Sequence, residues 1–317
     1  MKRLIAVVMA AALGWGLFWM WEARATKSQI TQWFEARQLE GWEASYSDLK
    51  LRGFPNRLDI TLTDVMLADP NTGLIWEAPF FQILGLSYKP GHKILIWPDS
   101  QTLNQTQITG SGLRASVVYT ADGDILRLNA EAESLNLSGS QNLALAGARA
   151  ALGQTSGTTY QLAIAAKSIA GEATALPTLG EGVSDSLQVQ AQIEFDRPWS
   201  LEAAHQRPQP RKIDLRQAQY SLDGLLLALA GDLDVDRDGQ ATGRLTLRAE
   251  NWRDMLAAAQ AADRIPAGLA KTVEQGLGLL SGLSGRTDTL DLPLTLNRGK
   301  AALGPISLGT APRLQLP

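Results

Sequence analysis

The chain has 317 residues, of which 45% are hydrophobic and 19% charged, and its net charge is −3 at pH 7. This composition supports a buried core and gives no overall basic surface for nucleic acid. The chain has no cysteine and only two histidines, His92 and His205, which excludes disulfides and leaves little material for a catalytic or metal centre. We therefore expect no enzyme, no catalytic residues, no metal site, no cofactor and no nucleic-acid partner.

The N-terminal segment has the pattern of a membrane anchor. Lys2 and Arg3 precede an uncharged run from Leu4 to Trp21, and Glu22 follows it. A helix over this run rises about 27 Å, close to the thickness of a bilayer's hydrocarbon layer. The basic residues at its start favour a cytoplasmic N-terminus with the remainder exported. Trp15, Trp19 and Trp21 gather at its far end, as expected for the aromatic residues of the outer membrane interface. We therefore predict that residues 1–22 cross a bacterial inner membrane once and that the bulk of the chain is periplasmic.

A cleaved signal peptide is the alternative for this segment. Ala23-Arg24-Ala25 fits the small-x-small pattern of a signal peptidase site, and cleavage there would release a soluble periplasmic protein that begins at Thr26. The apolar run is longer than the usual core of a signal peptide, which favours the uncleaved anchor.

The rest of the chain predicts a short helix followed by many strands. Residues 23–40 place Ile30 and Phe34 on one helical face and predict a connecting helix. Beyond Gly41, apolar and polar residues alternate, for example over 58–63 and 187–195, which is typical of antiparallel strands with one wet face. Residues 41–317 should form one β-rich periplasmic domain, or two lobes joined near 171–184 or 202–212.

Turn and helix signals interrupt the strands. Asp122-Gly123 and Asp238-Gly239 predict hairpins, and Pro293 favours an edge strand. Helices are predicted from Asn251, with Trp252, Met255, Leu256 and Ala259 as the apolar stripe, and from Pro266. The fold class is therefore mainly β with a few helices: a transmembrane helix, then large, curved antiparallel sheets that are sandwich-like or form a groove.

One acidic segment resembles a calcium loop, and we predict an ordinary hairpin turn in its place. Asp234, Asp236 and Asp238 precede Gly239 at EF-hand spacing, but Leu245 stands where that loop needs a bidentate glutamate.

Short motifs also carry a resemblance to a known family. The segment Gly53-Phe54-Pro55-Asn56-Arg57 after a membrane helix, Trp76-Glu-Ala-Pro79, and the closing 303–309 resemble a proteobacterial family known as domain of unknown function 2125. The resemblance covers essentially the full chain and implies location and architecture, but no activity. More loosely, the layout resembles AsmA-like envelope proteins, and residues 220–250 are the part most similar to them. That likeness implies an apolar groove formed by long sheets, and some of those proteins are implicated in lipid movement.

The Gly-Phe-Pro segment also has a local explanation. Gly53 permits a positive φ and Pro55 cannot donate to a β-ladder, so the strand should break there. The alternative is a partner-binding loop that exposes Phe54.

The strands predict a large apolar surface that something must cover. Cover by the protein itself would make a structural or docking module of the cell envelope that works with the inner membrane and with unknown envelope proteins, and we favour this function. A groove that carries lipid or another hydrophobic ligand is the alternative. The alternation suggests eight residues for its lining, although any core would use the same ones: Leu187, Val189, Ile193, Leu225, Leu227, Leu229, Leu245 and Leu247.

Overall fold

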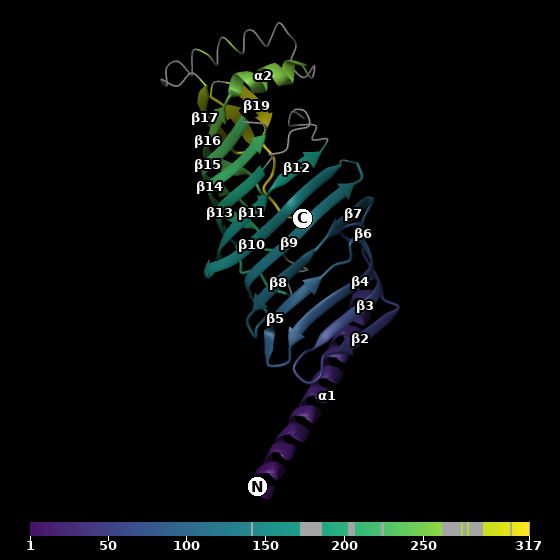
Figure 1. Cartoon of the computed structure of the whole chain (residues 1–317). Helices are drawn as coiled ribbons and strands as arrows, with labels where there is room; N and C mark the ends of the chain where they lie inside the picture. Colours follow the sequence, from purple (N-terminus) through teal and green to yellow (C-terminus); the bar gives the residue numbers. More distant parts are fainter. Residues whose placement is uncertain are drawn as a thin grey trace. The chain divides into compact units, whose positions relative to one another are not determined.

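The computed structural model describes residues 1–140, 142–171, 186–201, 207–222, 225–261, 274, 278, 288–304 and 306–316 (Figure 1). Antiparallel strands dominate these residues, which confirms the predicted mainly β class. The chain divides into two compact units. The N-terminal unit comprises Met1–Asp122 and Ala130–Ser140, and the C-terminal unit comprises Gly123–Asn129 and Gln141–Pro317.

The N-terminal unit begins with one unbroken helix, α1 (Lys2–Leu39), so the predicted anchor and connecting helix are continuous. Its more buried residues recur at helical spacing from Gly16 through Trp19 and Ile30 to Phe34. Phe34 is 6% exposed and packs in a core with apolar residues of the first strands. The helix is therefore fixed to the sheet along its C-terminal half.

The strands of the N-terminal unit form a forked sheet. One edge of β3 pairs with β1 and β2, and its other edge pairs with β4. The free edge of β4 is then divided between β5 and β6; β8 extends the β5 branch, and β7 followed by β9 extends the β6 branch. The strands are β1 (Glu43–Ser45), β2 (Asp48–Arg52), β3 (Asp59–Asp69), β4 (Leu74–Leu86), β5 (Lys89–Ile96), β6 (Ser100–Leu103), β7 (Thr106–Ser111), β8 (Arg114–Tyr119) and β9 (Ile125–Ser138). The residues of β9 before Ala130 belong to the C-terminal unit.

The C-terminal unit is a long antiparallel ladder. Its order is β10, β11, β13, β14, β15, β16, β17, β18 and β19, and β12 pairs with β10 beyond the end of β11. Helix α2 (Trp252–Ala261) lies between β16 and β17 in the chain. The strands are β10 (Leu143–Ser156), β11 (Thr159–Ala166), β12 (Ser168–Gly171), β13 (Ser186–Phe195), β14 (Pro210–Leu222), β15 (Leu225–Val235), β16 (Ala241–Glu250), β17 (Thr289–Asn297), β18 (Lys300–Leu303) and β19 (Ile306–Thr310).

Some predicted details differ from the structure. The strand that holds Pro293, β17, is not an edge strand, because β16 and β18 flank it. The Pro293 carbonyl accepts a hydrogen bond from the Gly304 N–H, just past the end of the β18 ladder. The nitrogen of Pro293 faces the same side as its carbonyl, so its missing N–H leaves no ladder bond of β18 unmade.

The compact units divide within residues 122–141. Most of 171–184, part of 202–212 and nearly all of the helix predicted from Pro266 lie outside the described residues.

Candidate functional site

The eight apolar residues singled out from the sequence lie on one face of the C-terminal sheet. Directly opposed residues of an antiparallel pair share a face. Val189 on β13 opposes Ala218 on β14, which in turn opposes Leu229 on β15, and Leu229 opposes Leu247 on β16. Alternation along each strand then adds Leu187, Ile193, Leu225, Leu227 and Leu245. We call this surface the apolar face.

The opposite face of the same strands is polar. Gln188, Gln190 and Gln192 alternate with the apolar residues of β13, and Gln217 Nε2 donates to Gln219 Oε1 at 2.5 Å along β14. The apolar face has no charged residue on β15, β16 or β17. On β13 and β14 the two faces therefore differ in chemistry, because side chains at neighbouring positions point to opposite sides.

Helix α2 covers one part of the apolar face. Trp252 is 3% exposed and packs with Ala249, Leu290 and Leu292, and Leu256 joins the same cluster. The sequence predicted this helix with Trp252 and Leu256 on its apolar stripe, and both residues face the sheet as expected from that periodicity.

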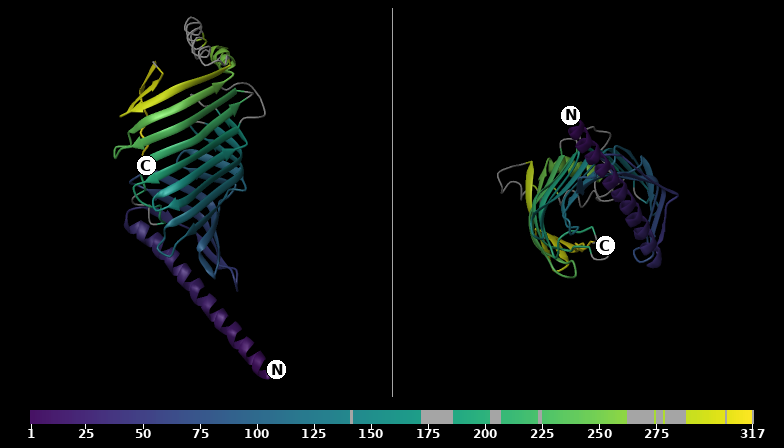
Figure 2. Two further views of the ribbon diagram at one scale, coloured as in Figure 1. Left: turned by 90° about the vertical axis from the view of Figure 1, so that its left-hand side faces the viewer. Right: turned by 90° about the horizontal axis from the view of Figure 1, so that it is seen from below.

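The C-terminal segment covers a second part. Leu314 packs against the cluster of Leu233, Ala241 and Leu245, and its N–H donates to the carbonyl of Gly239. Figure 2 shows the strands of this unit bending around the C-terminus.

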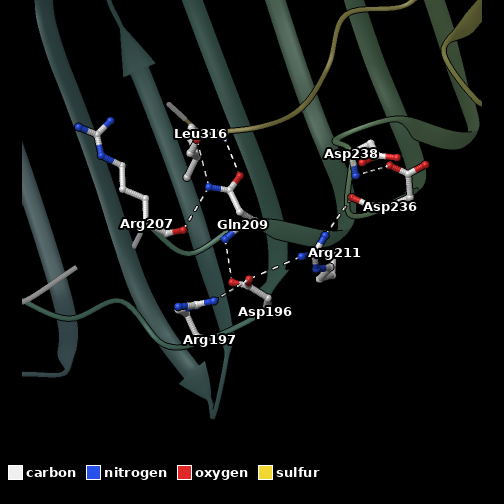
Figure 3. Close-up of polar contacts among 8 residues, drawn as sticks. All are labelled: Asp196, Arg197, Arg207, Gln209, Arg211, Asp236, Asp238 and Leu316. Atoms are coloured by element: carbon white, nitrogen blue, oxygen red, sulfur yellow. Dashed lines mark hydrogen bonds and ion pairs between the residues drawn. The ribbon is translucent and has the colours of Figure 1, made fainter. Parts of the chain in front are cut away.

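A reciprocal pair of hydrogen bonds holds the end of this segment. The Gln209 amide donates to the carbonyl of Leu316 at 3.0 Å and accepts from the Leu316 N–H at 2.9 Å (Figure 3). Gln209 itself is held by Asp196, whose carboxylate accepts its backbone N–H at 2.8 Å. The geometry imitates a β-ladder pair with a side chain in place of one backbone.

An aromatic group closes a third part. Tyr160 is fully buried, and its hydroxyl donates to the carbonyl of Ile125 at 3.2 Å and accepts from the N–H of Trp199 at 3.0 Å. Burial raises the pKa of this phenol. Phe195 lies between the rings of Tyr160 and Trp199, at centroid distances of 5.8 and 5.6 Å.

Between these covers, the apolar face keeps contact with solvent. Leu225 and Leu245 are buried, at 8% and 6% exposure, whereas the other six are only partly buried. Leu187, Val189, Ile193, Leu227, Leu229 and Leu247 form this accessible set. The arrangement can bind an apolar ligand by displacing water from aliphatic side chains.

The acidic segment 234–239 forms a hairpin turn, as predicted. Asp236 Oδ1 accepts the N–H groups of Asp238 and Gln240, both at 2.9 Å (Figure 3 shows the first). Its carboxylate therefore serves the turn itself. Among the described residues, no group of three or more metal-ligating side chains gathers. His92 contacts Ser116 Oγ at 2.9 Å on neighbouring strands, and His205 lies outside the described part of the chain.

The second candidate surface is the loop of residues 53–57 between β2 and β3, which we call the β2–β3 loop. As expected, the strand breaks here, with Gly53 at φ +112, and Phe54 is 61% exposed. The loop contacts α1 directly: Trp15 Nε1 donates to the carbonyl of Pro55 at 2.9 Å, and Trp19 Nε1 donates to that of Arg57 at 2.8 Å. The sequence placed these tryptophans at a membrane interface but gave no sign of these bonds.

A charged pair follows one turn farther along α1. Glu22 lies close enough to Lys93 on β5 for their charges to interact. Burial lowers the pKa of Lys93, and the negative charge of Glu22 opposes that shift. The helix therefore meets the sheet through the hydrogen bonds of Trp15 and Trp19 first and through the electrostatic attraction between Glu22 and Lys93 second.

The comparisons with known proteins agree with the family expected from the sequence. Helix α1 is long and apolar enough to cross a membrane, and a signal sequence would satisfy the same test. No curated protein and no solved structure matches the chain, so the likeness to AsmA-like proteins remains an expectation. One family model matches residues 19–312. The chain therefore belongs to the bacterial family described as "uncharacterized protein conserved in bacteria (DUF2125)".

Proposed function

We propose that this protein is a non-enzymatic, inner-membrane-anchored envelope protein that binds a lipid acyl chain on the apolar face of its periplasmic C-terminal unit. The observation that carries this proposal is the partly exposed, uncharged strip made by Val189, Leu229 and Leu247 with their neighbours. A structural or docking module, which the sequence alone favours, would have this strip fully covered by protein.

The dimensions of the apolar face suit an acyl chain. It extends over six neighbouring strands from β11 to β17, and at ~4.8 Å between strands it is roughly 24 Å wide. The acyl chains of one leaflet span roughly 15 Å. Burying ten methylene groups would contribute on the order of 8 kcal/mol before the costs of ordering are subtracted. An anchored protein also has such chains close at hand.

Site-specific photocrosslinking of the full chain in its membrane tests this function. A photoreactive amino acid at Leu229 or Leu247 lies on the apolar face, and the same group at Ala230 or Thr246 lies on the exposed polar face one residue away. We expect a phospholipid adduct, identified by mass spectrometry, from the first pair only. No lipid adduct at either face would refute lipid binding, and so would equal adducts at both. Protein adducts at Leu229 or Leu247 would favour the docking module.

A further inference from the structure

The β2–β3 loop touches α1 within the apolar run that we assign to the membrane. Gly16 faces the ring of Phe54 closely enough that an added Cβ would lie 3.8 Å from it, and Trp19 packs edge-on against the same ring at 5.4 Å. Trp15, which binds the loop, lies six residues before the end of the run at Trp21, or about 9 Å along the helix axis. The headgroup layer is only roughly 5–7 Å deep on each side of the hydrocarbon.

The loop backbone suits an environment with little water. Besides the two carbonyls that accept from tryptophan indoles, the Gly53 carbonyl accepts the Arg57 N–H at 2.7 Å and the Asn56 carbonyl accepts the Ser87 N–H at 3.0 Å. Irregular backbone at membrane depth is tolerated where the protein satisfies its polar groups. Here helix side chains, the loop's own Arg57 N–H and the adjacent β4–β5 turn provide those partners.

The side chains around the loop match the boundary between headgroups and acyl chains. Phe54 and Tyr88, the latter in the β4–β5 turn, are 61% and 57% exposed, and Trp21 is 66% exposed. Aromatic residues gather at this depth in membrane proteins. Arg57 keeps its charged group paired with Asp59 at 2.9 Å while its side chain remains half exposed, so the guanidinium can reach the headgroups.

We propose that the β2–β3 loop is a second membrane contact, in which Phe54 inserts beside α1 at the headgroup boundary and seats the N-terminal unit on the lipid surface. The alternative is a unit held above the bilayer on its helix, with Phe54 in water. This inference rests on the proposed membrane anchoring but is independent of lipid binding by the apolar face.

Because the natural chain has no cysteine, single labels can test this directly in the full-length protein. Phe54→Cys carries an environment-sensitive fluorophore in nanodiscs of phosphatidylcholine and phosphatidylglycerol. Asn71→Cys is the matched control, since it lies in the exposed turn at the opposite end of β3, roughly 35 Å away along an 11-residue strand. Ala11→Cys, in the middle of the apolar run, reports on the anchor itself.

We expect spin-labelled lipids to quench the label at Phe54 and aqueous iodide to leave it bright, with the reverse at Asn71. A label at Tyr88→Cys should behave as at Phe54, which guards against a local effect of one substitution. Iodide quenching at Phe54 equal to that at Asn71, or equal lipid quenching at the two sites, would overturn the loop insertion. If deep lipid quenchers reach Ala11 in that case, the anchoring survives; if they do not, the anchoring itself fails.

Discussion

Removing one oxygen from Tyr160 should destabilise the C-terminal unit far more than its size suggests. The hydroxyl holds two backbone groups from separate segments, the Ile125 carbonyl and the Trp199 N–H, at a fully buried position. A net hydrogen bond contributes about 1 kcal/mol, and a buried group left without its partner costs about 1–3 kcal/mol. Tyr160→Phe should therefore lower the free energy of unfolding by about 2–3 kcal/mol without creating a cavity.

Urea unfolding of the full chain in detergent micelles measures this loss. With m near 2–3 kcal/mol/M for a unit of this size, the midpoint of its transition should fall by about 1 M. Tyr46→Phe is the chemical control, because that hydroxyl makes a longer contact of 3.3 Å with Thr31 Oγ1 on the N-terminal unit, and it should change stability by less than about 0.5 kcal/mol. Equal small shifts for the two variants would refute the assigned role of Tyr160.

Three further outcomes are expected. Gly231→Ala should destabilise the sheet by about 2 kcal/mol or more in the same urea assay, because its φ is +143 and an added Cβ would meet the Arg244 carbonyl. Gly153→Ala is the control, because an added Cβ there would have nothing within 4 Å. Equal unfolding midpoints for the two variants would contradict this prediction. Because burial raises the pKa of Tyr160, the unfolded chain loses that proton first, so stability should fall as pH rises above about 10, and Tyr160→Phe should flatten the fall in alkaline unfolding curves. Gln209→Ala should speed carboxypeptidase trimming of the C-terminal segment, because the Gln209 side chain holds Leu316. Arg207→Ala should leave the trimming rate unchanged, because Arg207 contacts Gln209 through its backbone carbonyl, which the substitution keeps.

The apolar face was predictable from sequence because strand periodicity is exact. Val189 and Leu247 alternate with polar neighbours, so any register that buries one of them buries every second residue of its strand on the same side. The covers were harder to predict. The position of Trp252 could be predicted from the apolar stripe of its helix. The hydrogen bonds between Gln209 and Leu316, in contrast, join residues 107 positions apart. No local pattern encodes a contact of that kind.

The membrane-proximal loop shows the same limit. Gly53 and Pro55 correctly predicted a break in the strand, because their backbone constraints act locally. The indole bonds from Trp15 and Trp19 depend on how α1 lies against the sheet, 40 and 38 residues from their acceptors. The edge strand predicted from Pro293 was wrong for a related reason. Proline lacks the N–H for one ladder bond, but β18 ends before it reaches Pro293, so that bond is not needed.

The unbroken course of α1 also bears on how the bilayer would act on this protein. Helix α1 has 38 residues and no proline, so it has no hinge between its apolar run and Phe34, which is packed in the core of the N-terminal unit. Any tilt of the apolar run therefore tilts the N-terminal unit by the same angle. Apolar segments tilt according to the mismatch between their length and the hydrocarbon thickness. Lipid composition would therefore set the angle at which the N-terminal unit meets the membrane surface, even with no change in its internal structure.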